Sequence, residues 1–224
     1  MKKILILFLL VFSLVACKKE EGPVMEEPKT NESQENQEAG EIPSALPPMV
    51  RVDDRVYIST AYVNSLVTCG TADGEITSTV ESNQSLEKND QGNFGLGYEY
   101  QFWEDPYLNV KIDGEWIIFM DMAIDARSIP PMVAHFTAKV IETDQASLLV
   151  QPSEIPEEFH LKDLNKPVRL EIDNLDYSEN GHVTTKGLEG KSLEVYFDGR
   201  INNAEPESSI PASLGQIYKI EVLD

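Results

Sequence analysis

The chain is poor in cysteine, in basic residues and in long apolar runs. Cys17 and Cys69 are its only cysteines, which excludes the disulfide framework that supports many small secreted domains. Lysine and arginine number 18 against 39 acidic residues, so the net charge is −21. Because phosphate backbones select basic surfaces, this charge excludes nucleic acid as an expected partner.

The longest apolar run, residues 4–12, is too short to cross a bilayer, since a spanning helix needs about 20 apolar residues. The run follows Lys2 and Lys3 and leads into Ser-Leu-Val-Ala-Cys, which ends at Cys17. A basic start, an apolar middle and a small-residue end are typical of an export signal. We therefore expect residues 1–16 to be a signal peptide that is removed from the mature protein.

The residues Leu14, Val15, Ala16 and Cys17 resemble the lipobox of bacterial lipoproteins. This resemblance implies cleavage before Cys17 and attachment of a diacylglyceryl group to its sulfur. Two acyl chains anchor a protein durably, whereas one chain binds a membrane only marginally. We expect a lipoprotein whose membrane partner is bound through Cys17, on the outer face of the cytoplasmic membrane.

The segment after the lipidated cysteine is rich in Glu, Asn, Gln and Pro and contains no aromatic residue up to residue 49. Such a composition buries too little apolar surface to offset the conformational entropy of the chain. Residues 17–49 are thus predicted to be the lipidated cysteine and a disordered acidic tether.

Beyond the tether, short segments rich in Val, Ile, Tyr, Phe and Thr alternate with Gly, Asn, Asp and Pro, which indicates an all-β fold. The clearest signal is Asp113-Gly114 between two apolar runs, because this dipeptide favours a type I′ hairpin turn. We predict a hairpin over residues 108–119. Further strands are predicted at residues 55–60, 75–81 and 97–102, with a loop at 82–93.

Consecutive prolines at Pro130 and Pro131 break the strand pattern and mark a boundary between two small β modules. The first module is predicted to span residues 50–128 and the second residues 132–224. Five strands in the second module fit a small OB-like barrel. They are predicted at residues 135–142, 147–150, 168–172, 192–197 and 217–223.

Each module also resembles a known group of exported domains. Val195-Tyr-Phe-Asp-Gly-Arg-Ile201 with the closing Ile217-Tyr-Lys-Ile-Glu-Val resembles a family of small exported or membrane-anchored domains of unknown function from Gram-positive bacteria. Tyr57-Ile-Ser-Thr, Cys69-Gly-Thr-Ala-Asp-Gly and Gly97-Tyr-Glu-Tyr-Gln resemble a module of exported lipoproteins and of sensor-protease tails similar to the β-lactamase regulators. Both resemblances imply an extracytoplasmic address and carry no assigned activity.

Aromatic residues concentrate between positions 93 and 107, and this cluster provides the candidate binding surface. Trp103 and Tyr107 flank a loop-like Glu-Asp-Pro, and aromatic residues on loops are common in recognition sites. Asn93 and Phe94 stand in a second loop-like stretch ahead of a predicted strand. We expect these four residues to contribute to binding.

Candidate catalytic and metal-binding residues form no complete pattern. Cys69 stands in a glycine-rich turn and could act as a thiol nucleophile with His135 or His182 as base, or could simply pack inward. The stretch Asp176-Tyr-Ser-Glu-Asn-Gly resembles the first half of a calcium loop, but Gly187 stands where a bidentate glutamate is needed. We therefore predict no metal and no cofactor.

These observations together predict a binding protein whose ligand is unknown. Its expected partners are the membrane, through the lipid, and a protein of the cell envelope. The alternative is an exported thiol-dependent or metal-dependent hydrolase that uses Cys69 or a cluster of histidine and acidic residues.

We predict that Cys17→Ala releases the protein from the membrane or leaves the signal peptide uncleaved, because the lipid is the only anchor that this sequence predicts. Membrane fractionation and the apparent mass of the product test this. A processed Cys17→Ala protein that still sediments with membranes would contradict the lipoprotein assignment.

Overall fold

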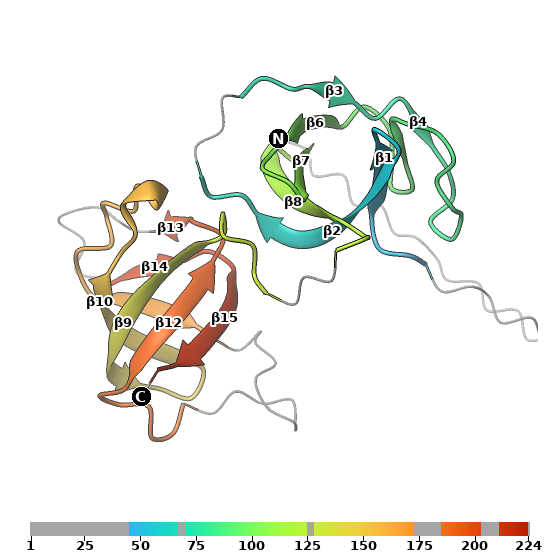
Figure 1. The fold of residues 1–224 in the computed structure, drawn as a ribbon. Coiled ribbons are helices and arrows are strands. Elements are labelled where there is room, and N and C mark those ends of the chain that lie inside the picture. The colour runs from blue at the N-terminus through green and yellow to red at the C-terminus, as the bar shows by residue number, and fades with distance from the viewer. Residues whose placement is uncertain (1–44, 67–69, 125–127, 173–184, 203–210, 224) are drawn as a thin grey trace, which may run out of the picture. The chain divides into compact units, whose positions relative to one another are not determined.

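A computed structural model of the chain describes residues 45–66, 70–124, 128–172, 185–202 and 211–223 (Figure 1). The chain divides into two compact units, Met1–Glu41 and Ile42–Asp224, and all described residues belong to the second. The predicted signal peptide, Cys17, Cys69, His182 and the calcium-like stretch at 176–181 lie outside the described residues. Within the described ranges, no helix has the length and apolar character needed to cross a membrane.

The predicted all-β fold is confirmed, since strands of two sheets account for nearly all regular structure of the described residues. The first sheet has eight strands in the order β3-β6-β7-β8-β2-β1-β5-β4. Its strands are β1 (Met49–Val52), β2 (Arg55–Val63), β3 (Gly74–Glu75), β4 (Ser78–Thr79), β5 (Gln91–Gly92), β6 (Glu99–Phe102), β7 (Tyr107–Ile112) and β8 (Glu115–Asp121).

The predicted hairpin is present as β7 and β8, which pair antiparallel from Tyr107 opposite Met120 to Ile112 opposite Glu115. Asp113 and Gly114 form its two-residue turn with φ values of 52° and 88°. Both values lie in the left-handed region that a type I′ turn requires.

One short segment closes the first sheet on itself. Its two edge strands, β3 and β4, are separated in the chain only by Ile76 and Thr77. The Ile76 N–H donates to the Tyr98 carbonyl at 2.9 Å, and the Thr77 N–H donates to the Asp90 carbonyl at 2.9 Å. The segment thus leaves the β6 side of the sheet and joins the β5 side, with the Ile76 side chain fully buried at the crossing.

The second sheet has seven strands in the order β13-β14-β11-β10-β9-β12-β15. Its elements are β9 (Ala134–Thr143), β10 (Ser147–Glu154), the 3₁₀ helix η1 (Glu157–Phe159), β11 (Val168–Glu171), β12 (Ser192–Phe197), β13 (Ile201–Asn202), β14 (Ala212–Leu214) and β15 (Ile217–Val222). The five predicted strands correspond to β9, β10, β11, β12 and β15. The short strands β13 and β14 were not predicted.

The last strand of the second sheet consists of two pieces, β14 and β15, and it closes this sheet into the OB-like barrel. β14 pairs parallel with β11, and β15 pairs antiparallel with β12. Only Gly215 and Gln216 separate the two pieces, so the last strand of the barrel contacts the third strand with one half and the fourth strand with the other. This arrangement matches the five-stranded barrel expected from the sequence.

Asp198 stabilises the two-residue interruption between β14 and β15. Its carboxylate is almost fully buried and accepts hydrogen bonds from the Gln216 N–H at 2.9 Å and the Arg200 N–H at 3.0 Å. The Arg200 guanidinium also donates to it through Nε at 2.6 Å. A side chain at Gly215 would collide with the Asp198 carboxylate, so this close approach requires glycine.

Each sheet encloses its own apolar core. Val50, Val52, Tyr57, Ile76, Tyr100, Leu108, Val110 and Phe119 form the first. The second is larger and includes Phe136, Val150, Leu170, Leu193, Val195 and Phe197. A third, smaller cluster of Ile118, Met132 and Val133 packs against aromatic residues from both sheets, among them Trp103, Tyr107 and Tyr218.

We predict that residues 132–224 fold alone, because their core is contiguous and their sheet closes without strands of the first. The fragment should give a β-type circular dichroism spectrum and a cooperative thermal transition. A random-coil spectrum, or folding only after residues 50–131 are added, would show that the two halves depend on each other for stability.

We also predict that Asp198→Ala lowers the free energy of unfolding by roughly 1–3 kcal/mol, because the backbone N–H groups of Gln216 and Arg200 lose their shared, buried acceptor. Urea denaturation measures the effect. The matched control is Glu115→Ala, which removes the other, more exposed partner of Arg200 at 3.4 Å and should cost less than about 1 kcal/mol. Equal losses in both variants would contradict this role of Asp198.

Candidate functional site

Four side chains form a continuous row on the outer face of the first sheet. Tyr107 is the cross-strand partner of Met120, and Met120 is the partner of Ile58. The Trp103 N–H donates to the Tyr107 carbonyl at 3.3 Å, which places Trp103 at the end of the row. Because side chains alternate across a strand and Phe119 points into the core, these four point outward. We call Trp103, Tyr107, Met120 and Ile58 the outer row.

The side chains of the outer row are partly exposed. The next row on the same face is buried, and two of its three side chains are polar. Gln101, Asn109 and Ile118 make up this second row. The Gln101 side-chain amide donates to the Thr71 carbonyl at 2.9 Å, and the Asn64 amide donates to Asn109 Oδ1 at 3.1 Å. The chain after β2 therefore covers the second row, while Trp103 and Tyr107 of the outer row pack in part against the third cluster and stay partly exposed.

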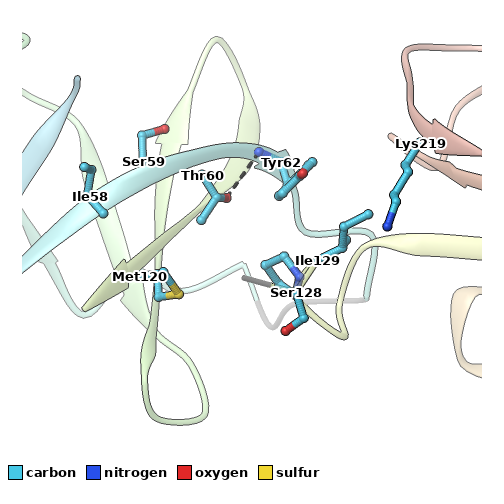
Figure 2. Close-up of a pocket in the computed structure, with 9 residues that line it drawn as sticks. Ile58, Ser59, Thr60, Tyr62, Met120, Ser128, Ile129 and Lys219 are labelled. Atoms are coloured by element: carbon cyan, nitrogen blue, oxygen red, sulfur yellow. Dashed lines mark hydrogen bonds between the residues drawn. The ribbon is translucent and has the colours of Figure 1, made fainter. Parts of the chain in front are cut away.

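An open groove of ≈ 440 Å³ continues the outer row (Figure 2). Its lining consists of Ile58, Ser59, Thr60, Tyr62, Met120, Ser128, Ile129, Pro130 and Lys219. Figure 2 shows Ile58 and Met120 towards one end of the groove and Lys219 at the other. Because Ile58 and Met120 belong to both the row and the groove lining, the two form one surface.

Hydrogen bonds made by Thr60 of β2 shape the groove wall. The Thr60 hydroxyl donates to the Ile118 carbonyl at 2.7 Å, and the Tyr62 N–H approaches the same hydroxyl oxygen at 3.3 Å (Figure 2). The β2–β8 pairing is irregular between Ser59 and Val63, and Ala61 has a φ of 61°. This bulge turns the chain and places the Tyr62 ring against Tyr218, with centroids 4.8 Å apart.

Arg55 connects the loop that carries Trp103 to the end of β8. Its guanidinium donates to Asp105 at 2.5 Å through one terminal nitrogen and to Asp121 at 2.6 Å through Nε. These hydrogen bonds raise the pKa of Arg55 above its ordinary value, although partial desolvation opposes them. Asp121 is buried and Asp105 is exposed, so Arg55 ties an outer loop to a fixed strand end.

A second groove, of ≈ 320 Å³, lies on the second sheet and contains His135. His135 Nδ1 lies 3.1 Å from the Val133 carbonyl, which can only accept a hydrogen bond, so this nitrogen is the donor and Nε2 stays available in neutral imidazole. Glu154 and Glu194 flank the groove floor, since both are cross-strand partners of Thr137.

Two aromatic rings enclose the His135 imidazole. The centroid of Phe159 lies 5.1 Å away and that of Tyr196 lies 5.4 Å away. Burial, assisted by the charge of Glu194 and a hydrogen bond to it, raises the pKa of Tyr196 to about 12. The tyrosine is therefore neutral at physiological pH and acts here as a packed aromatic side chain.

The structure places the four predicted binding residues in two different environments. Trp103 and Tyr107 lie together in the outer row. Asn93 is buried, where its side-chain oxygen accepts the Met49 N–H at 2.7 Å and its amide donates to the Pro47 carbonyl at 3.0 Å. Phe94 packs against the first core, with its centroid 5.6 Å from that of Phe119.

Sequence reasoning missed Met120 and Ile58 as site residues. The signal for Met120 was present, because a two-residue turn at Asp113-Gly114 dictates the register that sets Met120 opposite Tyr107. The signal for Ile58 was absent, because its pairing with Met120 joins segments distant in the chain.

The catalytic alternative rests on residues of which the structure describes only part. His135 is described, whereas Cys69 and His182 lie outside the described residues. Within the described ranges, no three His, Cys, Asp or Glu residues come together in a way that could hold a metal ion.

Comparisons with known proteins give no relative. No family model, no curated protein and no solved structure matches this chain. The two resemblances noted in the sequence therefore stay predictions, and the site must be interpreted from its own geometry.

Proposed function

We propose that this protein is a lipid-anchored binding protein of the bacterial cell envelope. The lipobox-like Leu14-Val-Ala-Cys17 supports the address, on the outer face of the cytoplasmic membrane. The acidic, proline-containing segment that follows supports a tether between the lipid and the β modules. Under this proposal, the outer row and its groove are the surface that the protein presents to a partner.

The outer row is the observation that carries the proposal. Its Trp, Tyr and Met side chains belong to the residue types that are enriched at protein interfaces. All four side chains are partly exposed, whereas the neighbouring Ile118 on the same face is fully buried. Large apolar side chains grouped in this way on a soluble surface are typical of an interaction site.

The neighbouring exposed residues extend this apolar surface. Met122 and Ile124 follow β8 directly, with exposed fractions of 54% and 44%. The Met122 N–H donates to the Val56 carbonyl at 2.9 Å, so the end of β8 stays beside β2 and beside the outer row. The surface is therefore larger than a single side chain and is built mainly on paired strands, which favours a defined binding site.

Photo-crosslinking in intact cells tests the proposal. The full-length protein, with a photoreactive amino acid at Met122, should form a defined adduct with an envelope component. Trp103→Ala should reduce this adduct strongly, because a central aromatic side chain at an interface commonly contributes about 2 kcal/mol, or roughly 30-fold in affinity. Thermal unfolding of the variant checks that the fold is retained.

Trp116→Ala is the matched control, because Trp116 faces outward from the same strand as Met120 but contacts Lys111 at the opposite end. It should leave the adduct unchanged. Cys69→Ser should also leave it unchanged if the protein acts by binding. Loss of the adduct on Cys69→Ser, with the fold intact and Trp103→Ala without effect, would favour the hydrolase.

A further inference from the structure

The proposed function leaves the chemistry of the partner open, and the inference here rests on that function. We infer that the outer row and its groove bind a basic polypeptide segment that inserts apolar side chains. Three properties of the surface support this inference: its apolar and adaptable side chains, its length, and the negative charge around it.

The surface is apolar but adaptable. Met120 lies at its centre and Met122 beside it, and an unbranched thioether side chain can adjust to the shape of different apolar groups. Ile129 and Pro130 also line the groove, so an inserted group would meet further apolar side chains there. Such a lining fits an aliphatic or aromatic side chain better than a carbohydrate or a small ion.

The length of the surface favours a polypeptide. From Ile58 to Trp103 the row crosses β2, β8, β7 and the end of β6, which is three strand spacings, or about 14 Å. An extended chain rises roughly 3.4 Å per residue, so a segment of about four residues would cover the row. A single small ligand would occupy only part of it.

The charge around the row is negative. Glu104 directly follows Trp103, is exposed, and takes part in no ion pair formed between described residues. Asp105, two residues after Trp103, is exposed as well, and the buried Asp121 lies on the other side of Arg55. Arg55 is the cation among them and is already engaged by Asp105 and Asp121.

The positive charge at the groove is also compensated. Lys219 is the one basic residue of the groove lining and forms an ion pair with Glu221. With a net charge of −21 on the whole chain, the surface attracts a basic partner and repels a second copy of itself or an anionic lipid headgroup. In a polypeptide with lysine or arginine beside apolar residues, the apolar side chains would contact the outer row and the basic side chains would complement the negative charge around it.

Fluorescence anisotropy with labelled peptides tests the inference on the full-length protein in detergent micelles. The probe has lysines at both ends and Leu-Phe-Met-Leu at its centre. One comparison peptide replaces the lysines by glutamates, and another replaces the apolar centre by serines. We expect the first peptide to bind at least about tenfold more tightly than either comparison peptide, with binding weakened by salt because exposed charges are screened.

Two charge-reversal variants identify the site. Glu104→Lys should weaken binding of the basic probe about tenfold, and Glu158→Lys, the same change on the exposed 3₁₀ helix of the other sheet, should weaken it less than about twofold. Met120→Ala should weaken it without altering its salt dependence. Equal effects of the two reversals, or equal binding of the acidic peptide, would overturn the inference.

The remaining outcomes separate this inference from the proposed function. If Trp103→Ala abolishes the cellular adduct but the basic probe does not bind, the protein is a binding protein with a different partner and the inference is wrong. If Trp103→Ala has no effect on the adduct, the proposed function itself fails. Self-association in sedimentation that Met120→Ala abolishes would assign the surface to a second copy and overturn the inference.

Discussion

Both sheets depend on the same constraint: within two residues, a single segment must leave a strand at or next to one edge of the sheet and join the opposite edge strand. In the first sheet Ile76 and Thr77 make this step, and in the second sheet Gly215 and Gln216 do. Unpaired backbone groups at sheet edges would otherwise invite association with other chains. Closure satisfies these groups internally, and it also decides which residues become core, since Ile76 is buried at the point where the step occurs.

Closure has a consequence for recognition, because a closed sheet offers few free backbone groups for the addition of a partner strand. Binding must then use side chains on the outer faces or in the loops. The outer row meets this condition: it stands on paired strands, beside a second row in which Gln101 and Asn109 are buried and hydrogen-bonded to the chain after β2. This packed neighbouring row explains how half-exposed apolar side chains keep a defined arrangement.

Local signals in the sequence predicted much of the fold, and distant pairings account for what they missed. Asp113-Gly114 predicted the hairpin, and alternation predicted the five long strands of the barrel. The two-residue strand β5 lies inside the predicted loop at 82–93 and carries no pattern of its own, since its partner β1 lies elsewhere in the chain. Asn93 illustrates the same limit at the site: its environment is decided by Met49, 44 residues away.

The bridge from Asp105 through Arg55 to Asp121 bears on how fast a partner could be captured. A loop that becomes ordered only on binding slows association. The ordering also lowers the net free energy of binding. Here the turn that follows Trp103 is already fastened to a buried carboxylate, so its indole is positioned before any partner arrives. Under the proposed binding function, encounter with a partner would then be limited by diffusion and orientation rather than by the ordering of this loop.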